Sequence, residues 1–269
     1  MSNPEELKAA VRERYADIVL QPRATSASCC SPASGAECGC INDSYVQLAG
    51  YVPEADYGLG CGLPTEVAYI APGDTVLDLG SGAGNDAFVA RAIVGEAGRV
   101  IGVDMTAAMI AKARANAAKL NYANVEFRLG EIEYLPVEGN SVDVVVSNCV
   151  LNLVPDKARA FAEVMRVLKP GGHFSISDIV VEGELPEAIQ RSMEAYAGCI
   201  AGAMQKADYV RLIEQTGFLA VRVAKEKVVS VPDELAVEAL GAEGAAQAKA
   251  SRARLLSVTV YGEKPAATG

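Results

Sequence analysis

Between residues 75 and 181 the sequence alternates between short apolar runs and helix-forming stretches. We expect strands at TVLDLG, RVIGVDM, VEFRLGEI, VDVVVSNCV and HFSISDIV, and helices at DAFVARAIVG, AAMIAKARANAAKL and KARAFAEVMRVL. Strands separated by helices of about 10–15 residues indicate βαβ units and a parallel sheet. The strands are apolar along their length, as expected when helices cover both faces. The pattern predicts an α/β domain with a Rossmann-like sheet.

The segments on either side of this core have different compositions. A charged amphipathic pattern in residues 1–20 predicts a helix, and the following QPRATSASCCSPASGAECGCIND predicts a loop. Beyond residue 182 we expect helices and two more strands, AVRVAKEKVVSV and LLSVTVYGEK. The chain then has three portions: an N-terminal helix with a Cys-rich segment (1–50), the Rossmann-like core (51–181) and a C-terminal helical and strand extension (182–269).

The charge balance and hydropathy restrict the possible partners. The chain has 24 Lys and Arg against 34 Asp and Glu, and no basic stripe that would suit a nucleic acid. No apolar run approaches the roughly 20 residues that span a bilayer. The charged start MSNPEELKAAVRERY does not look like a signal peptide. We therefore expect a cytoplasmic protein with no nucleic-acid or membrane partner.

Seven cysteines and a single histidine make an unusual set of potential ligands. An odd number of cysteines in a chain of this kind argues against a disulfide framework. His173 lies at the start of an expected strand, where a structural role is the ordinary interpretation. Cys–His catalysis and histidine-rich metal sites are therefore disfavoured, and a bound species would be held by sulfur.

The turn after the first strand carries a glycine-rich loop between two acidic residues. The spacing is Asp78-x-Gly80-x-Gly82-x-Gly84, followed by Asp104 at the end of the next strand. Glycines here allow a tight turn and close approach of a ligand to the start of a helix. Asp104 stands where an acid can accept ribose hydroxyls, and Asp78 where a carboxylate could meet an α-amino group. Because the loop lacks the G-x-G-x-x-G spacing that seats a pyrophosphate, the pattern favours S-adenosylmethionine over a dinucleotide.

These motifs resemble those of class I S-adenosylmethionine-dependent methyltransferases. LDLGSGAG is similar to their first motif, GVDMT to the second, GEIEYLP to the motif beside the adenine, and LKPGG to the turn before the fifth strand. The resemblance implies a seven-strand fold whose last two strands follow residue 217. It also implies S-adenosylmethionine as cofactor, with Glu131, Ile132 and Glu133 near the base. The other cofactor residues that it implies are Asp78, Gly80, Ser81, Gly82, Gly84, Asp104, Met105 and Asn148. Asn148 could instead simply cap its strand.

Three cysteines stand at positions that could meet at one site. Cys61 precedes the core, Cys149 ends the fourth strand, and Cys199 lies on an expected helix after the fifth. Ligands of open α/β sheets bind outside the carboxyl ends of the strands, so Cys149 should lie close to the cofactor's methyl group. Taken singly, each cysteine would more often be a small buried apolar residue. The absence of a C-x-x-C pair from the sequence disfavours a zinc ribbon.

A more specific resemblance surrounds these cysteines. YGLGCGLP, SNCVLNLVPDK and GCIAGA are similar to segments of the arsenite S-adenosylmethionine methyltransferase family. The resemblance implies that Cys61, Cys149 and Cys199 bind trivalent arsenic. It implies methyl transfer to arsenite and then methylarsenite, in arsenic detoxification, with thioredoxin or glutathione as reductant. Family members often carry a further N-terminal cysteine, for which no motif selects among Cys29, Cys30, Cys38 and Cys40.

The chemistry of such a site suits the residues present. Arsenite is soft and thiophilic, and soft ions select thiolate ligands. Its lone pair is the nucleophile and the sulfonium methyl group is the electrophile, so no general base is required. Two alternatives remain. One is a methyltransferase for a small organic acceptor such as a quinone, with the cysteines as core residues. The other is a protein that sequesters metalloid or zinc without turnover.

Overall fold

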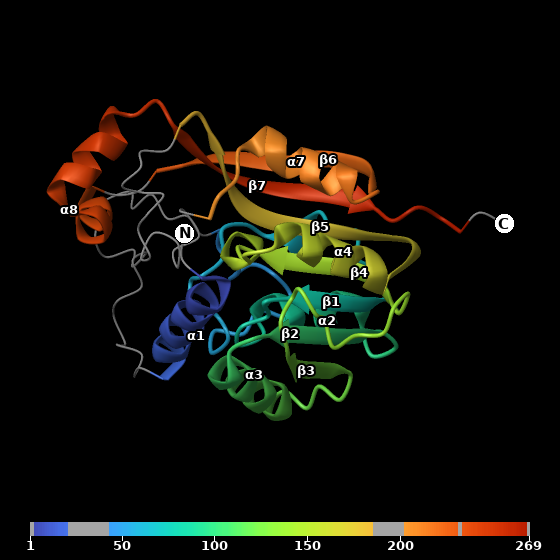
Figure 1. Cartoon of the computed structure of the whole chain (residues 1–269). Helices are drawn as coiled ribbons and strands as arrows, with labels where there is room; N and C mark the ends of the chain where they lie inside the picture. Colours follow the sequence, from blue (N-terminus) through green and yellow to red (C-terminus); the bar gives the residue numbers. More distant parts are fainter. Residues whose placement is uncertain (1–2, 21–42, 185–201, 231–232, 268–269) are drawn as a thin grey trace.

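The computed structural model describes residues 3–20, 43–184, 202–230 and 233–267 (Figure 1). Within them, a seven-stranded sheet has the order β3-β2-β1-β4-β5-β7-β6. Strands β1 to β5 are parallel, whereas β7 is antiparallel to both β5 and β6. The strands are β1 Thr75–Leu79, β2 Arg99–Asp104, β3 Val125–Leu129, β4 Val142–Asn148, β5 Leu168–Glu182, β6 Leu219–Val229 and β7 Arg254–Glu263.

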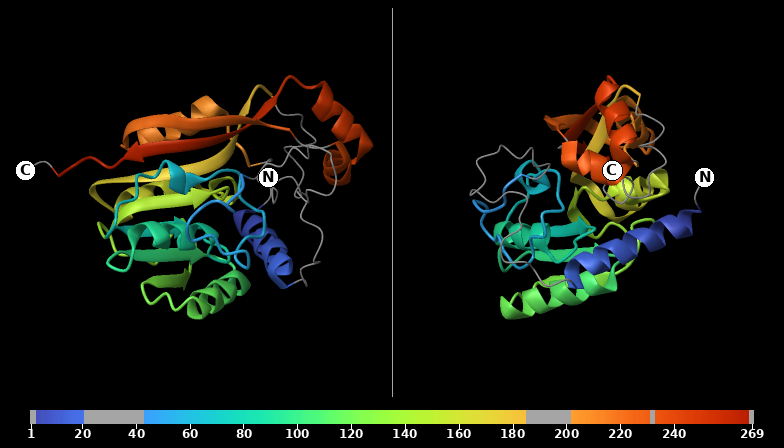
Figure 2. Two further views of the ribbon diagram at one scale, coloured as in Figure 1. Left: turned by 180° about the vertical axis from the view of Figure 1, so that it is seen from behind. Right: turned by 90° about the vertical axis from the view of Figure 1, so that its left-hand side faces the viewer.

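The helices that follow β1, β2 and β4 all start at the carboxyl edge of the parallel strands, where ligands of such sheets bind. Helix α1 lies beside α3 at this same edge (Figure 2). The helices are α1 Pro4–Leu20, α2 Asn85–Val94, α3 Ala107–Lys119, α4 Lys157–Val167, α7 Lys206–Gln215 and α8 Asp233–Ala250, with short 3-10 turns η1 Pro64–Glu66 and η2 Leu151–Leu153.

The predicted Rossmann-like α/β fold is confirmed, including two closing strands after residue 217. Those strands do not form a sheet of their own, because β7 pairs directly with β5. Most of the Cys-rich segment and most of the helix expected around Cys199 lie outside the described residues. The division of the chain into three portions stays a prediction. None of the described helices combines the length and apolarity needed to traverse a bilayer.

Side chains of the central strands alternate between two apolar cores. On β4, Val145 belongs to the core that contains Phe161 of α4, while Val144 and Val146 belong to the core that contains Phe88 of α2. Successive side chains of a strand point to opposite faces, so the two cores lie on opposite sides of the sheet. This double burial explains why the strands are apolar along their whole length.

Strand β5 carries one carboxyl group into the interior. Asp178 is fully buried, and the Tyr209 hydroxyl of α7 donates a hydrogen bond to its Oδ2 at 3.2 Å. Burial raises the pKa of Asp178 to about 7, a shift that the positive charge of Lys157 opposes. The contact ties α7 to the sheet through a carboxyl group that is costly to ionise.

Folding stability should therefore depend on the ionisation of Asp178. Its folded pKa of about 7 exceeds the ordinary value of 3.8, so the stabilisation is complete below about pH 4 and is lost as the pH rises through 7. The free energy of unfolding should decline across that range, with this group contributing at most about 1.4 kcal/mol per pH unit. Asp178→Asn still accepts from Tyr209 but cannot ionise, so urea denaturation should give a shallower decline. Equal slopes in both proteins would contradict this role.

Candidate active site

A pocket opens where the glycine-rich loop, the end of β2 and the end of β4 meet. Helix α1 closes one side of it with Lys8, Val11 and Tyr15. Two of the predicted cofactor residues, Gly84 and Glu131, are not part of the wall. The other predicted cofactor residues all line the pocket: Asp78, Gly80, Ser81, Gly82, Asp104, Met105, Ile132 and Asn148.

The glycine-rich loop requires glycine at two places for steric reasons. Gly80 has a φ of 65°, and a Cβ there would lie 2.4 Å from a Val150 methyl carbon. Gly84 has a φ of 102°, and its Cβ would lie 2.8 Å from the Phe88 ring. Residues that carry a Cβ rarely adopt this left-handed backbone conformation. The backbone conformation and the close contacts therefore both exclude residues other than glycine. Gly84 thus shapes the turn into α2 without lining the pocket.

Asp104 joins the loops that follow β1 and β2. Its Oδ2 accepts a hydrogen bond from Gly82 N at 3.0 Å, and its Oδ1 accepts one from Thr106 N at 2.7 Å. Burial raises the pKa of Asp104, and these backbone hydrogen bonds oppose the shift. Each carboxylate oxygen can accept more than one hydrogen bond. The group can therefore shape the loop and still bind a pair of hydroxyls.

Three buried oxygen atoms in the pocket wall have no hydrogen-bond partner among the described residues: Asp78 Oδ2, Ser81 Oγ and Asn85 Oδ1. Buried polar groups are normally paired, so this part of the pocket suits a polar ligand. Burial raises the pKa of Asp78 well above its ordinary value, and the neighbouring charges of Asp86 and Asp104 raise it further. A positively charged group on the ligand would offset both effects.

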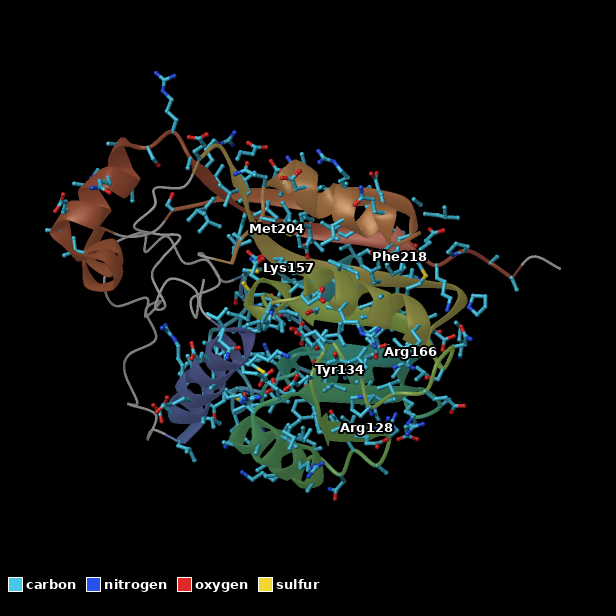
Figure 3. All side chains as sticks on the ribbon, viewed as in Figure 1. Arg128, Tyr134, Lys157, Arg166, Met204 and Phe218 are labelled. Carbon is cyan, nitrogen blue, oxygen red and sulfur yellow. The ribbon has the colours of Figure 1, made fainter. Side chains whose placement is uncertain are left out.

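Two arginines fix the segment that carries Ile132 into the pocket wall. Arg128 Nη1 donates to Pro136 O at 2.5 Å, and Arg166 Nη1 donates to Val137 O at 2.9 Å (Figure 3). The segment has only a short bridge of its own, so these side chains replace the hydrogen bonds of a strand.

Ion pairs fasten helix α1 over this segment. Lys8 Nζ lies 2.7 Å from a Glu131 carboxylate oxygen and 3.1 Å from one of Glu133. Arg12 Nη1 lies 3.3 Å from Glu131. Glu131 therefore binds α1, whereas Glu133 and Ile132 line the pocket. No sequence motif indicates this role of α1, because basic residues four positions apart are also the ordinary pattern of a solvated helix face.

Two of the seven cysteines fall within the described residues, and both are buried. Cys149 follows β4, lines the pocket and has a φ of 60°. A left-handed conformation costs a residue with a side chain roughly 1–2 kcal/mol. The Cys149 amide donates to Ser177 O at 2.7 Å, which holds this turn in place. Cys61 is wholly buried, its carbonyl accepts a hydrogen bond from Ser257 Oγ, and it belongs to the same small apolar cluster as Cys149.

The remaining cysteines cannot be placed at this site. Cys199, Cys29, Cys30, Cys38 and Cys40 lie outside the described residues. Among the residues that are described, no group of three or more His, Cys, Asp or Glu side chains is placed to hold a metal ion. Within that part of the chain, the predicted sulfur ligands are Cys149, which lines the pocket, and Cys61, which does not line it but belongs to the same apolar cluster.

The Asn148 side chain joins the two cysteine-bearing segments. Its Oδ1 accepts hydrogen bonds from the amides of Cys61 at 2.9 Å and Gly62 at 3.3 Å, and its Nδ2 donates to Gly62 O at 2.8 Å. Nδ2 also donates to the Tyr45 hydroxyl at 2.5 Å and to Asp86 Oδ2 at 3.2 Å. Tyr45 and Asp86 are not among the predicted site residues, because they stand 103 and 62 positions away from Asn148 and no motif links them.

Comparison with known proteins identifies relatives with a shared domain. The family described as methyltransferase domain matches residues 70–217. An arsenite methyltransferase of Halobacterium salinarum is 46% identical over 237 residues, which are 82% of this chain and 60% of that protein. The chain thus spans less than two thirds of that relative.

A solved structure and a third relative refine the comparison. The X-ray structure of CrArsM, an arsenic (III) S-adenosylmethionine methyltransferase from Chlamydomonas reinhardtii, matches with a TM-score of 0.65 at 38% identity. The match covers 77% of this chain and 68% of that one. A demethylmenaquinone methyltransferase of Lactococcus lactis is 39% identical over 37% of this chain and 40% of its own length. The similarity to a protein named for an organic acceptor therefore covers a smaller part of the chain.

Proposed function

Since the chain belongs to the methyltransferase domain family and, within it, to the arsenite S-adenosylmethionine methyltransferases, we propose that it methylates trivalent arsenic held on cysteine sulfurs. The substrates are arsenite and then methylarsenite, and the role is arsenic detoxification. The observation that carries the proposal is Cys149, a strained cysteine at the carboxyl edge of the sheet that lines the same pocket as the glycine-rich loop. Backbone strain of this kind is concentrated at functional sites.

The cofactor in this proposal is S-adenosylmethionine, which supplies the methyl group as a sulfonium electrophile. Asp78 pairs with its α-ammonium group, because the Asp78 Oδ2 is buried and has no partner among the described residues. Asp104 accepts the ribose hydroxyls, and Ile132 and Met105 pack near the base. The backbone around Gly80, Ser81, Gly82 and Gly84 lets the ligand approach closely.

The arsenic ligands in this proposal are Cys149, Cys61 and Cys199. Thiolates replace the oxygens of arsenite and leave a lone pair on arsenic, which attacks the methyl group. The protein's part is to aim this lone pair, since orientation alone can lower a barrier by several kcal/mol. Methylation formally oxidises arsenic by two electrons, so a thiol reductant, thioredoxin or glutathione, is required to return the product to the trivalent state.

One assay tests the proposed function. The protein is incubated with arsenite, methyl-labelled S-adenosylmethionine and glutathione, and the arsenicals are separated and identified by mass. Labelled methylarsenicals support the proposal. Stoichiometric arsenite binding without turnover would favour the sequestering protein, and the absence of arsenite binding would favour an organic acceptor.

The assignment of Asp78 predicts a pH-dependent affinity for S-adenosylhomocysteine, which keeps the α-amino group. Burial raises the Asp78 pKa, so a larger fraction of the carboxyl group is neutral at low pH and the ammonium contact is weaker there. Calorimetry should show tighter binding as the pH rises toward 7.5. Asp78→Asn should bind about ten- to hundredfold more weakly at that pH and lose the dependence.

A matched control for this experiment is Asp74→Asn. Asp74 Oδ2 accepts a hydrogen bond from Ala71 N in the turn before β1, at the amino edge of the sheet. This variant should bind like the wild type. Unchanged affinity in Asp78→Asn would remove Asp78 from the cofactor site.

The valence of arsenic predicts different effects at two cysteines. Arsenite has three exchangeable positions, whereas methylarsenite has two because one is occupied by carbon. Cys61→Ser should therefore slow arsenite methylation more than methylarsenite methylation. Cys149→Ser should abolish both, because a hydroxyl is a hard and protonated ligand at neutral pH. Initial rates with each substrate measure the contrast, and equal losses in Cys61→Ser would indicate a structural role for that cysteine.

The N-terminal cysteines have a separate test. We expect Cys29, Cys30, Cys38 and Cys40 to take part in capturing arsenic from a carrier thiol or in resetting oxidised cysteines. A variant with all four changed to Ser should then methylate glutathione-bound arsenite more slowly and show a changed dependence on thioredoxin. If both measurements equal those of the wild type, the four residues have no catalytic part.

A further inference from the structure

We propose that Asn148 is a positioning residue whose side-chain amide holds the Cys61 thiol in register with Cys149. The proposal deepens the proposed function and rests on it. It reassigns Asn148 from the cofactor to the sulfur site, because the protein itself engages both ends of its amide.

The first support is the geometry around Cys61. Asn148 Oδ1 accepts from the amides of Cys61 and Gly62, and Nδ2 donates to the Gly62 carbonyl, so one side chain binds three backbone groups of one turn. Three backbone hydrogen bonds to one side chain fix the path of the turn and therefore the position of the Cys61 Cβ. From the far side, Ser257 Oγ of β7 donates to the Cys61 carbonyl.

The second support is the pair of glycines that flank Cys61. A Cβ on Gly60 would lie 2.7 Å from Asn148 Nδ2, and a Cβ on Gly62 would lie 2.6 Å from Ser177 Oγ. Both distances are too short for a real side chain, so the turn can approach the end of β4 and the neighbouring part of β5 only with glycine at these positions. The Gly-Cys-Gly sequence of this turn is therefore explained by its contact with Asn148 and Ser177.

The third support is the pair of residues that orient the amide of Asn148. Asp86, in the first turn of α2, accepts a hydrogen bond from the Tyr45 hydroxyl at 2.9 Å and from Asn148 Nδ2 at 3.2 Å. A carboxylate and a hydroxyl that already donates its proton both require a donor from Asn148. They accordingly direct Nδ2 toward themselves and leave Oδ1 for the two amides of the Cys61 turn.

Through these contacts, the positions of both cysteines depend on the end of β4. Asn148 is the last residue of β4 and Cys149 is the next residue of the chain. Cys149 is fixed through its own backbone and Cys61 through the neighbouring side chain, so the separation of the two thiols follows from β4. Ligands held in advance at the right separation bind without an added ordering cost, which raises affinity.

The test compares arsenite dissociation constants of the full-length wild type, Asn148→Asp, Cys61→Ser and the double variant. In Asn148→Asp the carboxylate can still accept from the two amides, but an acceptor replaces Nδ2 opposite both Gly62 O and Asp86, so repulsion should displace the turn. We expect affinity to fall about ten- to hundredfold, as for the loss of two buried hydrogen bonds. The double variant should bind no more weakly than Cys61→Ser, because Asn148 acts through Cys61. Affinity for S-adenosylhomocysteine should fall much less than affinity for arsenite, because both ends of the Asn148 amide bind groups of the protein.

Asn124→Asp is the matched control. Asn124 Nδ2 donates to the carbonyls of Gly95 and Gly98, both at 2.8 Å, before β2 and β3 begin. Its side chain thus also holds a loop through backbone groups, but at the opposite edge of the sheet. This variant should bind arsenite like the wild type.

Several outcomes would overturn the proposal. Equal arsenite affinity in the wild type and Asn148→Asp would do so, as would a further loss in the Cys61→Ser background. A loss of S-adenosylhomocysteine binding would return Asn148 to the cofactor site. If the wild type binds no arsenite, the proposed function fails instead, and the geometric part is read from alkylation of Cys61, followed by mass spectrometry. Asn148→Asp, or Asn148→Ala if the former does not fold, should speed that alkylation about tenfold, whereas an unchanged rate rejects the positioning role.

Discussion

Hydrogen bonding at the end of β4 is the constraint on which the site depends. The sheet stops at Asn148, and the turn that contains Cys61 crosses this end with two amides and a carbonyl to satisfy. A buried backbone group without a partner costs about 1–3 kcal/mol, so one side chain that serves all three determines where the turn lies. Because β4 lies between β1 and β5 in the sheet, that position is next to the glycine-rich loop that follows β1. The turn that contains Cys61 and the pocket therefore adjoin as a consequence of strand order.

A second constraint is the crowding of carboxyl groups at the same edge. Asp78, Asp86 and Asp104 are all buried deeply enough that burial raises their pKa values, and for Asp86 the value is about 6. The three carboxyl groups have different hydrogen-bond partners. Asp104 accepts from backbone amides, and Asp86 accepts from the side chains of Tyr45 and Asn148. One oxygen of Asp78 has no partner among the described residues. The protein thus uses two of the three carboxyl groups to build the loops and leaves one oxygen of the third without a partner among the described residues.

The glycine-rich loop and the order of the elements were predictable because both depend on residues close together in sequence. Gly80 and Asp104 belong to motifs that can be recognised in a linear pattern, and the structure brings them to one pocket. Lys8 and Asn148 were not predictable in their observed contacts, since Lys8 pairs with Glu131 over 123 positions and Asn148 with Cys61 over 87. Such contacts exist only once the sheet has assembled. The left-handed backbone of Cys149 is of the same kind, because it follows from the Ser177 carbonyl on the neighbouring strand.

The acidic character of the pocket has a consequence for turnover on the proposed assignment. Asp78 contacts an ammonium group that is the same before and after methyl transfer, so this contact holds both forms of the cofactor equally. Three thiolates on trivalent arsenic give a complex with no net charge, and methyl transfer moves the positive charge from the sulfonium sulfur to arsenic. The carboxyl groups of Asp86 and Asp104 also line the pocket, and charge interactions in a low-dielectric interior exceed those in water. On that assignment the carboxyl groups attract the sulfonium form of the cofactor more strongly than the neutral thioether that remains, and the loss of that attraction upon reaction favours release of the spent cofactor.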